Sequence, residues 1–215
     1  MHRFGRGEPP VDFEKVASKC ATWGDFRAKF PTEHAQVGDV LYRRQNGFCA
    51  YCDCAIADKV KDGHIEHRER ISDNDGRMFD WTNMFFSSNH SDSCGVYKDR
   101  EAGSFKVEDV LDPSVESPLD YLEYDVLGGV AAKPNITAAA QRRAEETIRV
   151  FNLDQSARLR GSRRQVGETI NCLLSSNPTQ EEIVSFLDSV RSFEYFSVYC
   201  SLLGHYVPIP KTNAY

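Results

Sequence analysis

Apolar residues recur at mixed three- and four-residue spacing in two parts of the chain, the period of a helix with one buried face. In the first part the pattern runs over residues 11–48, and Gly47 stands near its end as a stop signal. Its apolar positions include Phe13, Val16, Trp23, Phe26, Phe30, Val37, Val40 and Leu41. We predict a helical N-terminal arm, preceded by a lead-in, MHRFGRGEPP, whose charges, Gly and Pro favour flexibility.

The second helical part begins at Thr137. One face of its first helix carries Ala140, Ala144, Ile148 and Phe151. A further helix is expected over roughly residues 154–174. Thr179 and Glu182 have the spacing of a capping box, which predicts the start of a third helix. The last ten residues, YVPIPKTNAY, are predicted to form a tail.

Between the helical parts the chain is turn-rich and dense in Cys, His, Asp, Asn and Gly, and residues 101–135 are predicted to be an extended connection broken by Pro and Gly. We therefore predict an α+β chain built from three segments. These are an N-terminal helical arm over residues 1–48, a small core over residues 49–110, and a connecting segment with a C-terminal helical region over residues 111–215.

The composition is that of an ordinary globular protein, with 40% hydrophobic and 27% charged residues among 215. No apolar run is long enough to span a bilayer, and the N-terminus does not resemble a signal sequence, so a cytoplasmic location is expected. Seven cysteines in such a protein favour metal binding over disulfides. The net charge of -6 argues against tight nonspecific DNA binding by this chain alone, although a partner could supply that affinity.

Residues 141–164 are locally basic, with seven arginines against three carboxylates. The simpler interpretation is a solvated helix surface. The alternative is a patch that faces phosphate or a partner on an otherwise acidic protein. The candidate contact residues in this segment are Arg158, Arg160, Arg163 and Arg164.

The candidate chemistry begins at Cys49 and Cys52. Two thiolates at CxxC spacing can grip one tetrahedral zinc ion from a tight turn, and Cys94 follows at a distance that allows it to join them. A thioredoxin-type redox pair is disfavoured because no βαβ pattern surrounds the motif. A buried pair without metal stays the alternative.

The fourth ligand is open. Ser88 would be a poor zinc ligand beside thiolate or imidazole. Cys54 lies so near Cys52 that one tetrahedral centre would be strained in using both. His90 stands four residues before Cys94, a workable separation. The predicted structural zinc set is therefore Cys49, Cys52, His90 and Cys94.

A carboxylate and an imidazole are adjacent at Glu66 and His67. A neutral imidazole can take a proton from water near neutral pH, and a carboxylate can hold a hard divalent cation such as Mg²⁺ or Mn²⁺. Together they suit hydrolysis of a phosphodiester, in which the metal stabilises charge on the scissile phosphate. His64 is either an additional site group or a surface histidine, and any single histidine here is otherwise a structural one.

Further residues extend this candidate site. The Asn83 amide could hold a strained loop in shape by bonding backbone on both sides. A helix that begins near Gly95 would place Asp99 one turn later, on the face that looks back toward the histidine. Lys98 or Arg100 could then contact phosphate.

Together these blocks resemble an HNH (ββα-metal) nuclease, and more closely the HNH nuclease subunit of Septu-type and retron-linked bacterial anti-phage systems. The similarity spans most of residues 8–165. It rests on LYRRQNGFCAYCDCAI, DGHIEHRERIS, FDWTNMFFSSN and DSCGVYKD, followed downstream by DPSVESPLDYLEYDVLGGV and RAEETIRVFNLDQSARLRGSR. The resemblance implies a ββα-metal core with a zinc knuckle, embedded in a mostly α-helical frame.

The resemblance also implies roles. His67 matches the general base, Asn83 the residue that orients the loop of that base, and Glu66 the carboxylate of the catalytic metal. Two positions depart from the family pattern: Ser88 replaces an expected cysteine, and Tyr97 stands where a histidine often precedes Lys-Asp. Asp99 is therefore taken as the second ligand of the catalytic Mg²⁺ or Mn²⁺.

Finally, the resemblance implies an ABC/SMC-like ATPase partner that senses and restrains the nuclease. The predicted function is that of a metal-dependent HNH endonuclease which cleaves nucleic acid, with DNA expected, as the effector of an ATPase-regulated bacterial defence complex. Two alternatives stay open. One is a catalytically weak zinc-binding docking module in such a complex, and the other is a standalone toxin nuclease.

Overall fold

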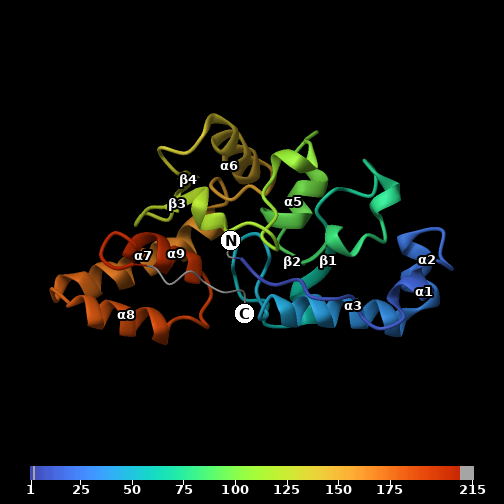
Figure 1. Cartoon of the computed structure of the whole chain (residues 1–215), viewed down its shortest axis with the longest axis horizontal. Coiled ribbons are helices and arrows are strands. Elements are labelled where there is room, and N and C mark those ends of the chain that lie inside the picture. The colour runs from blue at the N-terminus through green and yellow to red at the C-terminus, as the bar shows by residue number, and fades with distance from the viewer. Residues whose placement is uncertain (2, 209–215) are drawn as a thin grey trace.

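The N-terminal arm is helical in the computed structural model of the chain, which describes residue 1 and residues 3–208 (Figure 1). Its helices are α1 (Phe13–Ala17), α2 (Trp23–Lys29) and α3 (Pro31–Arg44). Helix α2 begins where the Thr22 hydroxyl accepts a hydrogen bond from the Asp25 N–H at 3.0 Å. Helix α3 begins with Pro31, whose fixed φ suits a first helical turn. The predicted helical arm is confirmed.

The central segment folds into an antiparallel hairpin followed by a helix. Strand β1 (Gly63–His67) pairs with β2 (Met84–Ser88), with Glu66 opposite Phe85. Helix α5 (Cys94–Arg100) packs on β2, and α3 packs across both strands. Short helices precede β1 and fill the long loop between the strands: α4 (Lys59–Asp62), η1 (Asp75–Arg77) and η2 (Trp81–Asn83).

The remaining elements lie to the left of the hairpin and above it in Figure 1. The connecting segment holds η3 (Val107–Asp109), η4 (Pro118–Asp120) and a second hairpin of β3 (Leu122–Tyr124) and β4 (Val130–Ala132). The C-terminal helices are α6 (Ala138–Val150), α7 (Ala157–Ser175), α8 (Gln180–Ser189) and α9 (Phe196–Leu203). The fold is thus a mixture of helices and small antiparallel sheets, as the α+β prediction requires.

The second hairpin was missed by the prediction of an extended connection over residues 101–135. Its strands are three residues each, too short to show an alternating pattern. The turn between them is held by Asp125, whose carboxylate accepts hydrogen bonds from the N–H groups of Leu127 (2.8 Å) and Gly129 (2.9 Å).

The helix starts in the C-terminal part agree with their sequence signals. The Thr137 hydroxyl caps α6, and both hydrogen bonds of the predicted capping box between Thr179 and Glu182 are present at the start of α8, at 3.2 and 2.7 Å. Helix α9 was not predicted. Of the predicted tail, residues 209–215 lie outside the described residues.

The lead-in is packed, so the expectation of flexibility was wrong. Phe4 is 2% exposed, and its ring meets that of Phe85 edge-on with centroids 5.9 Å apart. The Arg6 guanidinium lies 4.2 Å from the Phe85 ring centroid and donates hydrogen bonds to the carbonyls of Trp81, at 2.8 Å, and Met84. The first residues of the chain therefore close over the start of β2.

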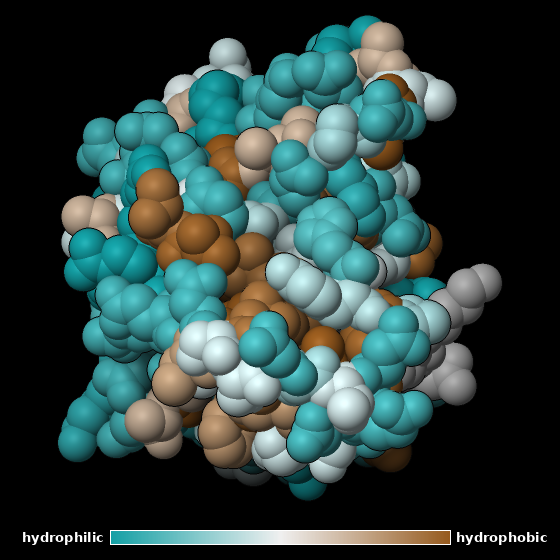
Figure 2. All heavy atoms as spheres, turned by 90° about the vertical axis from the view of Figure 1, so that its left-hand side faces the viewer, coloured by the Kyte–Doolittle hydropathy of each residue, from teal (hydrophilic) through white to brown (hydrophobic). Residues whose placement is uncertain are grey.

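Buried side chains from all three predicted segments form one contiguous core. One link across it is the stacked pair of Tyr51 and Phe151, whose ring centroids are 3.8 Å apart. Figure 2 shows the face that carries α7 and α8, where apolar side chains gather in a band among polar ones. In the described part of the chain, no helix has both the length and the apolar character needed to cross a bilayer.

Replacement of Arg6 by Ala should lower the free energy of unfolding by about 2–4 kcal/mol, because two carbonyls and an aromatic face lose a buried guanidinium partner. Chemical denaturation measures this change. The matched control is Arg3→Ala, which removes an exposed arginine of the same lead-in and should change stability by less than about 0.5 kcal/mol. Equal effects of the two substitutions would contradict the packed lead-in.

Candidate functional site

A tight hairpin turn over residues 47–56 carries the CxxC motif. The Cys49 N–H donates to the Cys54 carbonyl at 2.9 Å, and the Ile56 N–H donates to the Gly47 carbonyl at 2.8 Å. Within the turn, the Asp53 N–H returns to the Cys49 carbonyl at 3.1 Å. These bonds bring the Cys49 and Cys52 side chains to the same buried region.

Cys94 meets this turn from the first residue of α5. Its backbone has a left-handed φ of 60°, and its N–H donates to the Phe151 carbonyl at 2.9 Å. The sulfur atoms of Cys49, Cys52 and Cys94 all lie within 4.8 Å of one another and are buried. Burial raises the pKa of the Cys49 thiol, but hydrogen bonds from Cys52, Cys54 and Cys94 more than offset this and hold it well below its usual range. The group could hold a metal ion and is compatible with structural zinc.

The structure does not bring His90 to these sulfurs. His90 is exposed and is not part of the sulfur group. Ser88 lies closer, because its N–H donates to the Cys49 sulfur at 3.4 Å, and its buried Oγ has no hydrogen-bond partner among the described residues. Cys54, set aside on sequence grounds, has its sulfur 3.2 Å from that of Cys52. The signal that could have found it is the CxxCxC spacing.

A hollow of about 330 Å³ opens at the end of β1. The residues that line it include the predicted pair, Glu66 and His67, and the candidate carboxylate on α5, Asp99. Trp23, His64 and Arg70 also line it. The structure therefore brings Glu66, His67 and Asp99 together at one solvent-accessible place.

His67 is held in one orientation within this hollow. Its Nε2 lies 2.9 Å from the Met78 carbonyl, which can only accept, so a neutral ring carries its proton on Nε2 and keeps the lone pair on Nδ1. Trp23 meets the ring edge-on, with centroids 4.7 Å apart. Burial lowers the pKa of His67, and the charge of Glu66 only partly offsets this. The imidazole is therefore favoured in the neutral form that can accept a proton.

Asn83 fixes the long loop between β1 and β2. Its Oδ1 accepts the N–H of Glu69 at 2.8 Å, and its Nδ2 donates to the carbonyls of Glu69 (3.0 Å) and Arg77 (3.3 Å). Arg77 directly precedes Met78, whose carbonyl binds His67. Asn83 thus contacts the loop that orients the histidine, and it lies outside the hollow itself.

An ion cluster lies beside the hollow, with Lys98 and Glu66 buried and Asp99 half-exposed. The Lys98 ammonium lies 2.9 Å from Glu66 Oε1 and 2.7 Å from Asp99 Oδ1, and it donates to the His67 carbonyl at 2.6 Å. The predicted surface contact from Lys98 to phosphate is therefore wrong: this side chain is 0% exposed, because the carboxylates draw it inward. Burial raises the pKa of Glu66, but the charges of Lys98 and His64 more than offset this and lower it.

The four arginines predicted to form a contact patch do not share one role. Arg163 is buried and donates to the carbonyls of Leu153 and Leu159, so its prediction as a contact residue is wrong. Arg158 turns toward the start of α5, where it bonds the Ser93 hydroxyl at 2.8 Å. The other two are exposed, and each lies near a carboxylate, Arg160 near Asp154 and Arg164 near Glu168.

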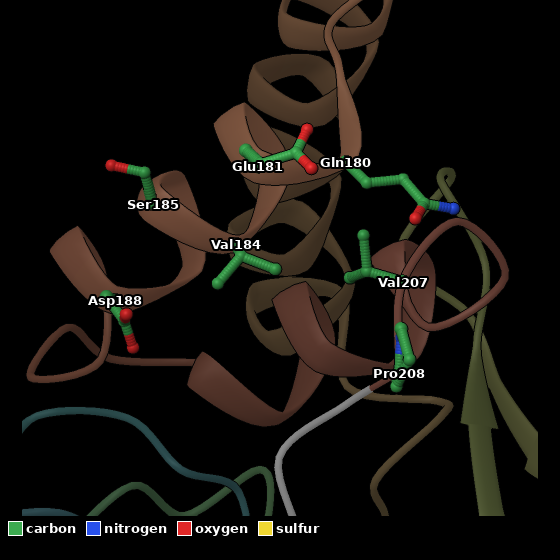
Figure 3. Close-up of a pocket in the computed structure, with 7 residues that line it drawn as sticks. All are labelled: Gln180, Glu181, Val184, Ser185, Asp188, Val207 and Pro208. Atoms are coloured by element: carbon green, nitrogen blue, oxygen red, sulfur yellow. The ribbon is translucent and has the colours of Figure 1, made fainter.

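A second hollow lies between α8 and the end of the described chain, with a volume of about 460 Å³. Figure 3 shows Val184 of α8 and Val207 on its facing walls, with Glu181 and Asp188 around them. The hollow is apolar at its centre and acidic at its edge. It contains none of the predicted site residues.

Comparisons add no family to this description. No protein-family model matches the chain, and no curated protein matches its sequence. We looked among the described residues for three or more His, Cys, Asp or Glu side chains close enough to share one metal ion, and the trio of Cys49, Cys52 and Cys94 is such a group. The function must therefore be inferred from the geometry of the hollow and of the sulfur cluster.

Replacement of Lys98 by Met should lower the free energy of unfolding by about 3–5 kcal/mol at pH 7, because it leaves the Glu66 carboxylate buried without its cation. The pKa of Glu66 in the native protein lies below its ordinary value of 4.5, so the stability linked to it is present above that pH and is lost as the pH falls. In the variant, burial without Lys98 raises the pKa of the Glu66 carboxyl, so Glu66 takes up a proton and the difference in stability between variant and wild type narrows as the pH falls from 7 to 4.5.

Urea denaturation at pH 7 and pH 4.5 measures both values. Lys61→Met is the matched control, since the Lys61 side chain is 82% exposed and pairs with a surface carboxylate, that of Asp58. A loss of stability in Lys98→Met that is the same at both pH values would contradict the role of the ion pair.

Proposed function

We propose that this chain is a metal-dependent endonuclease of the HNH type, which hydrolyses phosphodiester bonds in nucleic acid, with DNA as the expected substrate. The observation that carries the proposal is the fixed His67. A neutral imidazole, anchored through Nε2 to the Met78 carbonyl, stands at the end of β1 in a hollow that it shares with two carboxylates. The order of strand, long loop, strand and helix around it is the one that the HNH resemblance implies.

In the proposed mechanism His67 is the general base. Its Nδ1 takes a proton from the attacking water, and the Met78 carbonyl stabilises the imidazolium that forms. Asn83 and Arg77 hold the loop that bears this carbonyl, so they position the base. Arg70, which lines the hollow, is held by the carbonyls of Gly103 and Lys98 and lies 3.7 Å from Asp99, so it adds a positive charge at the place where phosphate would bind.

The catalytic cation is proposed to bind Glu66 and Asp99. Carboxylate oxygens are the ligands that Mg²⁺ and Mn²⁺ prefer, and the bound ion would stabilise charge on the scissile phosphate and the leaving oxygen. In the structure both carboxylates already share the Lys98 ammonium. A divalent ion therefore competes with Lys98 for the same oxygens, and this competition would weaken metal binding before substrate arrives.

Structural zinc is proposed at Cys49, Cys52 and Cys94. It would join the 47–56 turn to the start of α5 and so fix the helix that carries Lys98 and Asp99. The predicted partner, an ABC/SMC-like ATPase, is part of the same proposal. It is supported by the acidic net charge of -6, which leaves DNA affinity to be supplied from outside the chain.

One observation favours the second candidate, a catalytically weak docking module. Lys98 pairs with one oxygen of each carboxylate, as in a structural ion cluster, and it is fully buried. In that case the hollow would be a remnant, and the sulfur cluster would serve only to shape a surface for the partner. Nuclease assays separate these two candidates.

His67→Ala should abolish cleavage of supercoiled plasmid in Mg²⁺ or Mn²⁺, with a fall of about 100-fold or more, because general-base catalysis contributes that much. His205→Ala, which removes an exposed histidine of the C-terminal region, should cleave at the wild-type rate. Each protein is assayed with and without the proposed ATPase partner.

Cleavage that requires His67 and changes with the ATPase is the expected result. Cleavage of the same rate in His67→Ala would rule out the proposed base, and a fully folded wild type without activity under every condition would leave the docking module. A cleavage rate that does not change when the ATPase is added would favour a standalone toxin nuclease.

The acid limb of the kcat/KM profile should lie below pH 6.5, the ordinary value for an imidazole, because burial lowers the pKa of His67. The neutral ring is the active form, so activity falls as the pH drops through this pKa. Trp23→Leu should move the limb toward higher pH by letting water reach the ring. A wild-type limb at or above pH 6.5 would contradict His67 as a buried base.

A further inference from the structure

The backbone of the 47–56 turn places Cys54 directly opposite Cys49. Phe48 and Ala55 form an antiparallel bridge, and the Cys49 N–H donates to the Cys54 carbonyl at 2.9 Å, so the next pair inward is Cys49 with Cys54. Side chains of directly opposed residues in antiparallel backbone lie on the same face. The reversal is made at Asp53, whose φ of 68° is left-handed. The Cys54 side chain is thus turned back toward that of Cys49.

The sulfur contacts agree with this register. Cys54 Sγ lies 3.2 Å from Cys52 Sγ, and the sulfurs of Cys49, Cys52 and Cys94 all lie within 4.8 Å of one another. All four side chains are buried. Zn–S bonds of roughly 2.3 Å in a tetrahedron separate neighbouring sulfurs by about 3.8 Å. The trio of Cys49, Cys52 and Cys94 is already close to that size, whereas Cys54 lies outside it, so the Cys54 side chain would move toward Cys94 to complete the tetrahedron.

We propose that Cys54 is the fourth ligand of the metal, which completes a four-thiolate site with Cys49, Cys52 and Cys94. This inference rests on the metal site of the proposed function and does not depend on nuclease activity. The adjacency of Cys54 to Cys52 does not exclude the site, because the left-handed residue between them reverses the chain.

The other fourth-ligand candidates are weaker. His90 is exposed, whereas Cys54 is buried with its sulfur 3.2 Å from that of Cys52. The Ser88 hydroxyl is buried close to the cluster, but a neutral hydroxyl competes poorly with a thiolate for zinc. The Ser87 hydroxyl, 3.8 Å from the Cys49 sulfur, already accepts the N–H of Gly95 at 3.1 Å.

The charge around the cluster also fits four thiolates. Zinc with four thiolates carries a net charge of −2, which requires a nearby cation or N–H donors when it is buried. Arg158 of α7 supplies such a charge. Its guanidinium lies beside the first residue of α5, where it bonds the hydroxyl of Ser93, the neighbour of Cys94, at 2.8 Å. The Ser88 N–H to the Cys49 sulfur adds a neutral donor.

The direct test is X-ray absorption at the zinc edge on the wild-type full chain. The expected first shell is four sulfur atoms at about 2.3 Å. Three sulfurs with one nitrogen or oxygen would overturn the assignment of Cys54. This measurement needs no variant, so a failure of folding cannot obscure it.

Variants identify which residue supplies the fourth sulfur. Cys54→Ser should reduce the thiolate-to-metal charge-transfer absorption of the Co²⁺-substituted protein by about a quarter, since one of four thiolates is lost. It should also lower the affinity for zinc, measured by competition with a chelator, by about 100-fold or more. This exceeds the effect of losing a group that only supports a ligand. His90→Ala, Ser88→Ala and Cys172→Ser, the last at an exposed cysteine, should leave both readouts unchanged.

Unchanged spectrum and affinity in Cys54→Ser, or a loss in His90→Ala or Ser88→Ala, would overturn the inference. Wild-type protein that binds neither Zn²⁺ nor Co²⁺ would overturn the metal site as a whole. Neither readout involves DNA cleavage, so a protein with four thiolates and no nuclease activity would separate a correct metal site from a wrong enzymatic assignment.

Discussion

The contact among buried cysteine sulfurs is the interaction on which the central part of this protein depends. Cys49 and Cys52 belong to the 47–56 turn, and Cys94 is the first residue of α5. A short hairpin of five-residue strands has little apolar surface of its own to hold a helix against it. The sulfur cluster compensates by holding both ends of the β2–α5 connection, because Ser88 at the end of β2 donates to the Cys49 sulfur and Cys94 begins α5. A bound metal would replace these contacts with metal–sulfur bonds.

The position of α5 in turn decides the chemistry of the hollow. Lys98 reaches from this helix to Glu66 on β1, so one ammonium ties the helix to the strand and sets the charge at the end of the strand. His67 is fixed separately, by the Met78 carbonyl of the long loop. The base and the carboxylates are therefore held by different parts of the fold, and a change in α5 would alter the metal ligands without releasing the imidazole.

The two ends of the described chain support the same region. Arg6 closes over the start of β2 through the carbonyls of Trp81 and Met84. At the other end, Asp53 of the turn accepts the N–H and the hydroxyl of Ser197 at the start of α9, at 3.1 and 2.9 Å. Segments far apart in sequence thus clamp the turn and the hairpin, which explains why the three predicted parts share one core.

Local sequence determined the elements whose signals are local. The helical arm, the Thr179 capping box and the clustering of Cys, His and Glu in the central segment all follow from spacing and residue type, because caps and helix periods act within a few residues. The packed lead-in, the β3–β4 hairpin and the inward turn of Lys98 and Arg163 were decided by tertiary contacts. Carbonyls and carboxylates brought from distant segments outweighed the preference of these charged side chains for water.

The cysteines show the same division between what local sequence determines and what the tertiary structure decides. Sequence alone selected Cys49, Cys52 and Cys94, since their spacing is that of a metal site, and set Cys54 aside for being too near its neighbour. Distance along the chain is a poor guide to distance in space where the backbone reverses. The left-handed conformation of Asp53 turns Cys54 back onto Cys49, and only the folded backbone specifies that reversal.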